Sequence, residues 1–244
     1  MTINMAFIRQ KEAAIGNAVC GGACVMSHPT YDFLTPAARR YLPVKRALDV
    51  LLSGCGIVVL SPVLLGVALA VKLESPGPIL FKQKRVGKNK KTFEIWKFRS
   101  MRTDTPKDLP THLLNDPEHF ITRTGRFIRK TSLDELPQLF NIFAGQMAVI
   151  GPRPALWNQD DLIAERDKYH ANDIRPGLTG WAQINGRDEL EIPVKAKLDG
   201  EYVQKMSFLF DCKCFFGTIT SVLKHDGVVE GGTGTLEKEK AEKQ

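Results

Sequence analysis

The chain has 244 residues, a length that suits one domain with appendages and leaves room for a buried core. Its formal net charge is +7, but 34 basic residues stand against 27 acidic ones, a bias too mild for a nucleic-acid-binding tail and better suited to anionic lipid head groups or phosphorylated substrates. The five cysteines lack the paired Cys-x2-Cys spacing of a zinc site and predict free thiols in a reducing compartment.

Residues 1–40 form a lead-in without a sustained hydrophobic period, and they contain turn-forming pairs such as Gly21-Gly22. We expect this segment to be loosely ordered and assign it no function. Arg9 and Lys11 are not followed by a continuous apolar run, so no cleavable signal peptide is expected. The main part of the chain should therefore face the cytoplasm.

An uncharged stretch from Val50 to Val71 lies inside a predicted membrane segment over residues 41–72. Thirteen of its twenty-two residues are Leu, Ile or Val, which favours insertion into a bilayer by about 4 to 8 kcal/mol. A straight helix of this length would reach about 33 Å, enough to cross the hydrocarbon core. Ser61-Pro62 interrupts it, because a proline removes one backbone donor and pushes against the carbonyl of Val58. The Ser61 hydroxyl could satisfy a carbonyl that Pro62 leaves without a partner.

Three placements of this stretch stay open: a re-entrant helix-turn-helix, a kinked spanning helix and a buried core helix. The core helix is disfavoured because such helices are usually shorter and amphipathic. Lys and Arg near the ends of a membrane segment are retained in the cytoplasm, and a hairpin bent at Ser61-Pro62 keeps both flanks on that side while each half dips about 16 Å. We therefore favour the re-entrant form. The flanking cations are Arg39, Arg40, Lys45 and Arg46 upstream, and Lys72, Lys82, Lys84, Arg85, Lys88, Lys90 and Lys91 downstream.

Two short segments rich in Phe, Ile and Trp, residues 79–85 and 92–101, follow a breaker at residues 74–78. The turn residues between them predict a β-hairpin close to the membrane surface. Lys97 and Arg99 lie near the end of its second arm. They fit a phosphate contact and a solvated strand end equally well.

A proline-rich loop over residues 102–120 leads to a basic stretch ending at Lys130, in which four cations, Arg129 among them, precede a helix start. That placement favours phosphate binding over a random charged face. Ser132 and Glu135 have the spacing of a capping box, so we expect a helix to begin there. The expected core face of this helix consists of Leu133, Leu136, Leu139, Phe140 and Phe143.

Asp134 and Glu135 fall in the first turn of this predicted helix. Acids are common there because they complement the helix dipole, and that reading alone explains them. The dipole and the upstream cations also hold carboxylates ionised, and an ionised carboxylate among cations can attack phosphorus. Adjacent helical residues point in different directions, so one acid can serve as nucleophile while the other holds a divalent cation such as magnesium.

Two further loops carry candidate substrate contacts. In Gly151-Pro152-Arg153-Pro154, the flanking prolines fix the backbone of Arg153, which suits either a pre-set guanidinium for phosphate or a rigid turn. The loop over residues 175–187 is rich in glycine and can bring polar groups to a ligand, although a structural turn also fits. Its candidate contacts are Arg175, Gln183, Asn185 and Arg187.

Residues 206–224 read as an amphipathic helix, either interfacial or part of the core. The tail, residues 229–244, is expected to be disordered. One face of the helix carries Phe208, Leu209, Cys212, Phe215, Phe216, Ile219, Val222 and Leu223, and Asp211, Lys213, Thr218, Ser221 and Lys224 lie toward the other.

With these motifs in chain order, the sequence resembles the bacterial sugar transferase family, also called the monotopic phosphoglycosyl transferases. Any one motif is weak, but six in this order are highly specific and together cover about residues 45–228. The matching landmarks are Lys45 to Asp49, Ser61-Pro62, Lys97 to Met101, Ser132 to Asn141, Gly151 to Pro154, and Arg175 to Arg187.

The resemblance implies transfer of a hexose 1-phosphate from a UDP-sugar to a polyprenyl phosphate such as undecaprenyl phosphate, with release of UMP. In family terms Asp134 would form a covalent phosphosugar intermediate, Glu135 would bind Mg²⁺, and Arg129 would contact phosphate. Lys97, Arg99, Arg153, Arg175, Gln183, Asn185 and Arg187 would be further substrate contacts.

The resemblance also implies the re-entrant helix and a place at the bacterial inner membrane, with inner-membrane lipids as partners. Because only about forty residues precede the first motif, the chain looks like the minimal form of the family. Lys90 stands where many members have glycine.

Taken together, the expected fold is α+β and mostly helical: a membrane-monotopic protein with one re-entrant helix-turn-helix, a small β-hairpin and interfacial amphipathic helices around a cytoplasmic catalytic region over residues 73–228. The expected function is the first membrane step in the assembly of a surface glycan, such as an exopolysaccharide, lipopolysaccharide or capsule. Two rival functions are a non-catalytic protein that binds anionic lipid and a glycosyltransferase that releases UDP. The sugar, the pathway and a homodimer stay open.

Overall fold

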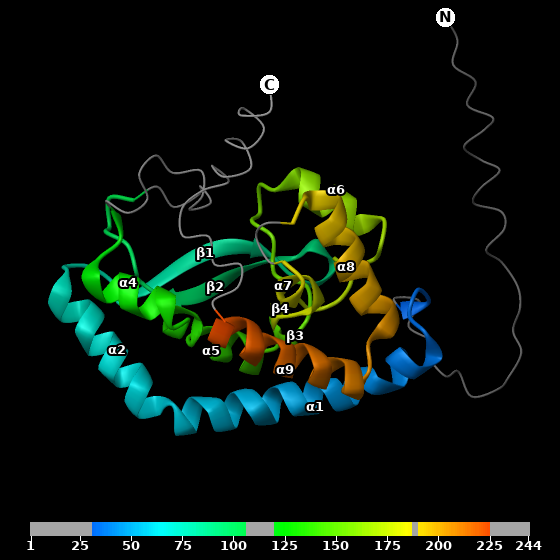
Figure 1. Ribbon diagram of the computed structural model, residues 1–244, viewed down its shortest axis with the longest axis horizontal. Coiled ribbons are helices and arrows are strands. Elements are labelled where there is room, and N and C mark those ends of the chain that lie inside the picture. The colour runs from blue at the N-terminus through cyan, green and yellow to red at the C-terminus, as the bar shows by residue number, and fades with distance from the viewer. Residues whose placement is uncertain (1–30, 106–119, 187–189, 225–244) are drawn as a thin grey trace, which may run out of the picture. The chain divides into compact units, whose positions relative to one another are not determined.

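The computed structural model describes residues 31–105, 120–186 and 190–224 (Figure 1). The expected tail, most of the lead-in and most of the loop over residues 102–120 lie outside the described residues. Every element below belongs to one unit of the chain, which begins at Asp32. In this unit the fold is mostly helical with a small β-hairpin, as expected.

The apolar stretch forms two helices, α1 (Pro36–Val59) and α2 (Ser61–Glu74), bent by 62° where they meet. α1 begins before the expected residue 41 because Thr35 caps it, accepting a hydrogen bond from the Ala38 amide at 3.2 Å. The predicted break at Ser61-Pro62 is confirmed. Ser61 Oγ donates to the carbonyl of Val58 at 2.8 Å, which satisfies the group that Pro62 cannot serve.

The bent pair leaves most of its large side chains uncovered, so the core-helix alternative is wrong for this segment. Only Val67 and Val71 are buried among the large apolar residues of the pair, and they pack against Phe98 and Ile128. No single helix in the described part of the chain is long and apolar enough to span a bilayer. Taken together, the two helices of the bent pair have the length and the hydropathy that a membrane segment needs. Its exposed apolar residues include Leu51, Leu52, Val58, Val59, Val63, Leu65, Leu69 and Leu73.

The predicted hairpin is confirmed, with β1 (Leu80–Val86) antiparallel to β2 (Thr92–Phe98). β2 ends before the expected residue 101. A short 3-10 turn, η2 (Lys88–Lys90), joins the strands, and both Asn89 and Lys90 have positive φ, 54° and 58°. The sequence prediction of a turn is therefore correct, and the position at which the resemblance implied glycine is one whose backbone favours glycine.

α4 (Arg123–Lys130) follows, and the carboxylate at the end of α2 caps its first turn. Glu74 accepts hydrogen bonds from the amides of Arg123 and Thr124 at 2.7 and 3.0 Å. Arg99 holds the residues that directly follow α2, because it donates to the carbonyls of Ser75 and Pro76 at 2.7 and 2.8 Å. Contacts on both sides of its C-terminus thus join α2 to the hairpin and to α4.

The capping-box prediction at Ser132 is wrong. Ser132 has φ 56°, a left-handed conformation that ends α4, and its side chain caps nothing. A three-residue 3-10 turn, η4 (Leu133–Glu135), and the short α5 (Gln138–Phe143) replace the expected helix. Because the helical register is broken, Phe143 is 52% exposed and Phe140 is exposed as well, whereas the polar Gln138 and Asn141 are buried.

The rest of the region builds on a two-stranded parallel sheet of β3 (Ala148–Ile150) and β4 (Gly177–Thr179). Its helices are α6 (Asp160–Asp167), α7 (Trp181–Ile184), α8 (Ile192–Lys205) and α9 (Phe208–Lys224). α9 lies along α1 in Figure 1, and the two helices meet at a buried ion pair of Asp211 with Lys45, 2.6 Å apart.

The burial of α9 differs from the expected pattern. Asp211, expected on the polar face, is only 8% exposed because Tyr41, Lys45 and Tyr202 all donate to its carboxylate. Leu209 is 79% exposed. The core-helix alternative is therefore wrong for the apolar face of α9, which also exposes Phe208, Phe215, Phe216 and Ile219.

The strained turn of the hairpin yields a stability prediction. Lys90→Gly should raise the melting temperature by a few degrees, because glycine adopts positive φ without the steric cost that lysine meets. The exposed ion pair of Lys90 with Asp167 contributes little to set against this gain.

Thermal unfolding in detergent would measure the change. Lys88→Gly, in the same turn but outside the positive-φ positions, is the matched control and should not stabilise the protein. A lower melting temperature for Lys90→Gly than for the unmodified chain would contradict the prediction.

Candidate active site

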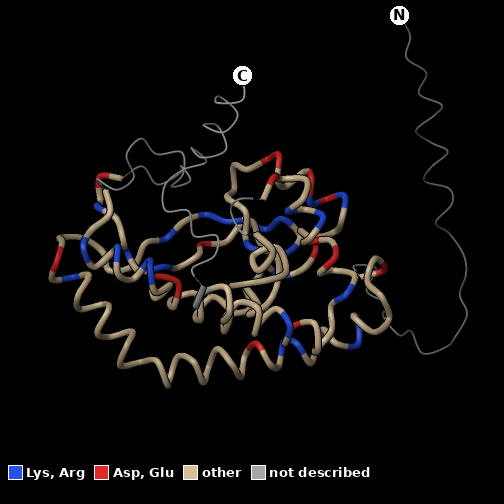
Figure 2. Tube along the Cα trace, viewed as in Figure 1, with Lys and Arg blue, Asp and Glu red and all other residues tan. Residues whose placement is uncertain are grey.

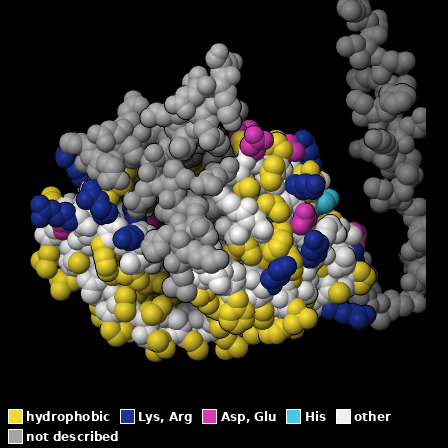
Figure 3. Space-filling view, in the orientation of Figure 1, with side chains coloured by type: hydrophobic (Ala, Val, Ile, Leu, Met, Phe, Trp, Pro, Cys, Tyr) yellow, Lys and Arg dark blue, Asp and Glu magenta, His cyan; other side chains and the backbone are white. Residues whose placement is uncertain are grey.

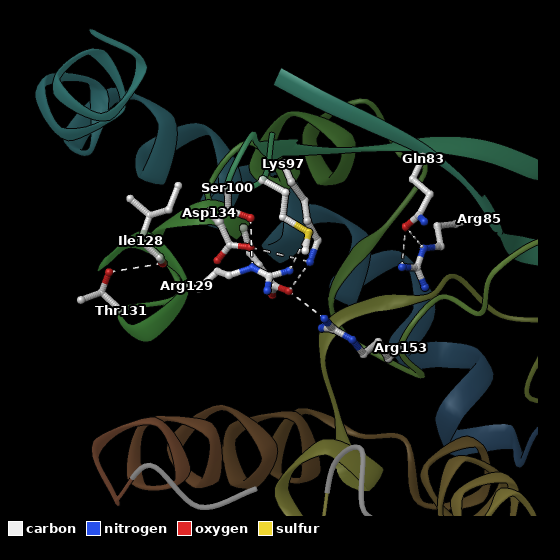
Figure 4. A network of polar contacts seen from close by, with 11 residues as sticks. Gln83, Arg85, Lys97, Ser100, Ile128, Arg129, Thr131, Asp134 and Arg153 are labelled. Carbon is white, nitrogen blue, oxygen red and sulfur yellow. Dashed lines mark hydrogen bonds and ion pairs between the residues drawn. The ribbon is translucent and has the colours of Figure 1, made fainter. Parts of the chain in front are cut away.

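Asp134 and Glu135 lie on η4, at the reversal between α4 and α5. The left-handed Ser132 turns the chain, and the neighbouring Leu133 and Leu136 pack onto the apolar cluster around Phe98 and Ile128. These leucines anchor η4 to that cluster. The two carboxylates are thereby held against cations from two other segments (Figure 4).

The Glu135 carboxylate joins three elements. Lys97 Nζ, from β2, lies 2.8 Å from Oε1, and Arg153 Nη2, from the turn after β3, lies 2.7 Å from the same oxygen. Burial raises the pKa of Glu135, but the charges and hydrogen bonds of Arg153 and Lys97 outweigh it and hold that pKa well below its usual range. Glu135 is therefore a permanent anion at neutral pH.

Asp134 has a different environment although it is the adjacent residue. Its side chain is buried, with the residue 8% exposed, and its Oδ2 lies 3.9 Å from Lys97 Nζ, too far for a hydrogen bond. Burial raises the pKa of Asp134; Lys97 and Arg129 oppose this rise, and the charge of Glu135 adds to it. The pKa values of the two adjacent carboxylates therefore move in opposite directions, and Asp134 is the more basic of the two.

Arg129 is held beside Asp134 by the segment after β2. Its Nε donates to Ser100 Oγ at 3.0 Å and its Nη2 lies 3.7 Å from Met101 Sδ, and Figure 4 shows its guanidinium next to the Asp134 carboxylate. Arg129 comes from the last turn of α4 and not, as expected, from a basic stretch that leads into a helix start. Sequence reasoning placed the residue near the carboxylates and missed the hydroxyl and thioether that orient it.

The structure therefore brings together Lys97, Arg129, Asp134, Glu135 and Arg153, all predicted from the sequence. It places other predicted residues elsewhere. Arg99 is committed to the end of α2, Arg175 donates to the carbonyl of Gly145 at 3.0 Å, and Asn185 donates to the carbonyl of Trp181 at 2.7 Å. Arg187 lies outside the described residues.

Gln183 is a special case among the predicted contacts. It is 7% exposed, and neither its amide nitrogen nor its amide oxygen has a hydrogen-bond partner in the described part of the chain. Gly180 packs so closely against the backbone of Gly151 that a Cβ atom at Gly180 would clash with the Gly151 carbonyl oxygen. The same Cβ atom would lie 3.2 Å from the Gln183 amide oxygen. The unsatisfied amide is thus next to the turn that carries Arg153. A buried polar group without a partner costs stability, so a bound water or a ligand is the natural explanation.

Magnesium would have to find its ligands here among few groups. No cluster of three or more Asp, Glu, His or Cys side chains occurs among the described residues. Magnesium commonly takes one or two protein carboxylates and completes its shell with water and substrate phosphate. Glu135 fits this role in charge and position, although its Oε1 already receives both cations.

A buried carboxylate pair with divergent proton affinity, ringed by three cations, is the kind of site found in enzymes that act on phosphate esters. A family model described as bacterial sugar transferase matches residues 40–225. The chain belongs to the bacterial sugar transferase family.

Individual members of this family are similar to the chain over most of its length. The chain is 43% identical to the exopolysaccharide production protein PSS of Rhizobium leguminosarum bv. phaseoli over 196 residues, 75% of this chain and 96% of the relative. It is 40% identical over 205 residues to the UDP-glucose:undecaprenyl-phosphate glucose-1-phosphate transferase of Escherichia coli K12, 78% of this chain and 42% of that protein. The match to the Aeromonas hydrophila UDP-N-acetylgalactosamine-undecaprenyl-phosphate N-acetylgalactosaminephosphotransferase is 37% over 191 residues, 75% and 44%. The chain spans less than half the length of the last two.

The opposite pKa directions of the two acids predict opposite effects on stability. Because the pKa of Asp134 is raised, the ionised group destabilises the fold at neutral pH, and Asp134→Asn should raise the melting temperature. Glu135→Gln should lower it, because the depressed pKa of Glu135 marks stability that is present above the ordinary pKa of glutamate.

Melting temperatures measured from pH 7 downward, with a chelator present, would test both signs. The gain from Asp134→Asn should shrink as the pH falls to the ordinary pKa of aspartate. The loss from Glu135→Gln should begin to shrink below the ordinary pKa of glutamate, where the unfolded chain takes up the proton, and should vanish once the pH falls through the depressed pKa of the folded protein. Equal shifts of the same sign for both variants would contradict the division of roles.

Proposed function

We propose that the protein transfers a hexose 1-phosphate from a UDP-sugar to a polyprenyl phosphate, undecaprenyl phosphate in its relatives, and releases UMP. The observation that carries the proposal is the buried Asp134, more basic than an ordinary aspartate, beside the Glu135 carboxylate that Lys97 and Arg153 hold. The printed activities of the E. coli and A. hydrophila relatives support the same reaction type.

In the first step an oxygen of Asp134 forms a bond to the β-phosphorus of the donor. The bond from that phosphorus to the bridging oxygen breaks, and the oxygen leaves with its electron pair as part of UMP. Attack and departure are in line, and the charge that develops on the phosphoryl oxygens is stabilised by Lys97, Arg129 and Arg153. The phosphosugar is then an acyl phosphate of Asp134.

In the second step a phosphate oxygen of the polyprenyl phosphate bonds to the same phosphorus. The Asp134 carboxylate leaves with its electron pair, and the product is a polyprenyl diphosphate sugar. A raised pKa makes the carboxylate a stronger nucleophile in the first step, and Lys97 and Arg129 favour the ionised form that has to attack.

Glu135, with phosphate oxygens of the donor, would hold Mg²⁺, which would neutralise charge on the diphosphate. Glu135 also keeps Lys97 and Arg153 in place through its hydrogen bonds. The buried amide of Gln183 is the candidate contact for a polar part of the donor. Arg99, Arg175 and Asn185 act in this proposal through the backbone they hold.

The α1–α2 pair is proposed to enter the inner membrane as a re-entrant helix-turn-helix, with the site on the cytoplasmic side. Figure 2 shows few charged residues along the bent pair, and Figure 3 shows hydrophobic side chains gathered along the lower edge of the molecule, over α1 and α2. The exposed aromatic residues of α5 and α9, such as Phe143 and Phe216, suit the interface between head groups and lipid tails.

The released nucleotide decides between this reaction and its rivals. Membranes with the protein, given UDP-sugars, undecaprenyl phosphate and Mg²⁺, should release UMP, and mass spectrometry of the quenched protein should find a hexose phosphate on Asp134. Asp134→Ala should reduce UMP release by about 10³-fold or more, because it removes the nucleophile itself.

Asp104→Ala, an exposed carboxylate paired with Arg102, is the control and should keep wild-type activity. Release of UDP would instead indicate a glycosyltransferase. Release of neither nucleotide with any UDP-sugar would indicate a non-catalytic lipid-binding protein. A screen of UDP-sugars in the same assay would identify the sugar, and with it the class of exopolysaccharide, lipopolysaccharide or capsule.

The membrane topology is tested by labelling single cysteines. In a variant without the five native cysteines, Arg40→Cys and Lys82→Cys should both resist a charged thiol reagent added outside intact cells and react after lysis. Val59→Cys, beside the bend, should be shielded in both conditions, because a hairpin places it near the bilayer midplane. Labelling of Lys82→Cys from outside would show that the bent pair crosses the membrane.

A further inference from the structure

The backbone after β3 is held in an unusual way. Four successive carbonyls, those of Pro152, Arg153, Pro154 and Ala155, each accept a hydrogen bond from a different group. The donors are the Gly177 amide at 2.8 Å, Arg166 Nη1 at 2.9 Å, Arg85 Nη1 at 3.0 Å and the Val86 amide at 2.9 Å. This segment belongs to neither a helix nor a strand, yet its acceptors are satisfied as completely as those of a sheet.

Two of the four donors are arginine side chains, and other side chains fix both of them. Gln83 Oε1 accepts from Arg85 Nη2 at 2.7 Å and from Nε at 3.2 Å. Asp199 Oδ2 lies 2.8 Å from Arg166 Nε and 2.6 Å from Nη2, and the side chains of this pair are only 4% and 1% exposed. Each guanidinium therefore reaches its carbonyl from a fixed position, without the rotamer freedom of a surface arginine.

The consequence falls on Arg153, whose own carbonyl is one of the two that the arginines hold, whose next neighbour carries the other, and whose side chain points to the carboxylates. Prolines on both sides fix the neighbouring φ angles, and hydrogen bonds to the carbonyls of Arg153 and Pro154 fix the orientation of the peptide planes that follow. From this backbone the Arg153 guanidinium meets Glu135 at 2.7 Å. In Figure 4, the Arg153 side chain points toward the carboxylates, and the Gln83–Arg85 pair lies apart from them on the right.

We propose that Arg85 and Arg166 are positioning residues for Arg153: they clamp its backbone so that the guanidinium stands where Glu135 and the transferring phosphoryl group need it. The inference rests on the proposed function for its readout. Arg85 and Arg166 come from β1 and α6, so the hairpin and the helical part of the region jointly set the position of one cation. Mispositioning of a catalytic group by about 1 Å can lower the rate by about 10²-fold. A clamp that prevents such a displacement would therefore have a measurable effect on catalysis.

A double-mutant cycle in the UMP-release assay tests the proposal. Arg153→Met should lower kcat/KM by about 10²- to 10³-fold, as loss of one charge-stabilising donor does. Arg85→Met should lower it by about tenfold, and Arg85→Lys, which keeps a donor for the Pro154 carbonyl, by less. If Arg85 acts through Arg153, the double variant Arg85→Met/Arg153→Met should be no slower than Arg153→Met alone.

Losses that multiply in the double variant would overturn the proposal, since Arg85 would then act on substrate or on folding by itself. Wild-type activity of Arg85→Met would overturn it as well. Lys84→Met, an exposed neighbour on the other face of β1, is the matched control and should leave kcat/KM unchanged.

Arg166 needs a charge-balanced variant, because removing it alone leaves Asp199 buried and unpaired. Arg166→Met with Asp199→Leu should reproduce the loss and the non-additivity with Arg153→Met. Amide hydrogen exchange at residues 153, 155 and 156 gives a readout free of catalysis and should quicken in both clamp variants relative to Lys84→Met. If exchange is faster in the clamp variants but the wild-type protein releases no UMP, the clamp is upheld and the proposed reaction is refuted. If exchange in the clamp variants is unchanged, the clamp is refuted.

Discussion

The Glu135 carboxylate is the point on which the site depends. One of its oxygens receives Lys97 from the hairpin and Arg153 from the turn after β3, so three segments far apart in the sequence meet at one buried anion. A buried charge is stable only when its partners have fixed geometry, and here the partners are themselves fixed by strand pairing and by a fully hydrogen-bonded turn. With the charge of Glu135 committed in this way, its neighbour Asp134 stays only weakly paired and more basic.

On α5 and α9 the usual pattern of buried apolar and exposed charged side chains is reversed. Asp211 is buried with three donors around it, while the aromatic residues on the opposite side of α9 are exposed, as are Phe140 and Phe143 on α5. In water this arrangement would leave a large apolar surface exposed to solvent, which is unfavourable. Against lipid it is the ordinary one, because apolar side chains meet the acyl region and each polar group finds a partner inside the protein.

Much of this could be read from the sequence, because local chemistry decides it. The bend follows from Ser61-Pro62, and the hairpin from its turn residues and alternating apolar segments. Arg153 was singled out because flanking prolines pre-set its backbone. The sequence could not show that Ser132 would adopt a left-handed conformation and cancel a capping box, nor that Arg99 would serve the end of α2, because those outcomes are chosen by tertiary contacts.

The junction at the end of α2 has a mechanical consequence. Glu74 caps α4 with two hydrogen bonds, and Arg99 holds the carbonyls that follow α2, so the last turn of the bent pair and the helix leading to Asp134 behave as one piece. The fold therefore fixes the distance from the apolar surface of α2 to the Asp134 carboxylate. In the proposed reaction, a lipid-linked phosphate would therefore have to bring its head group to that height, because the fold fixes the level of the carboxylate above the apolar surface.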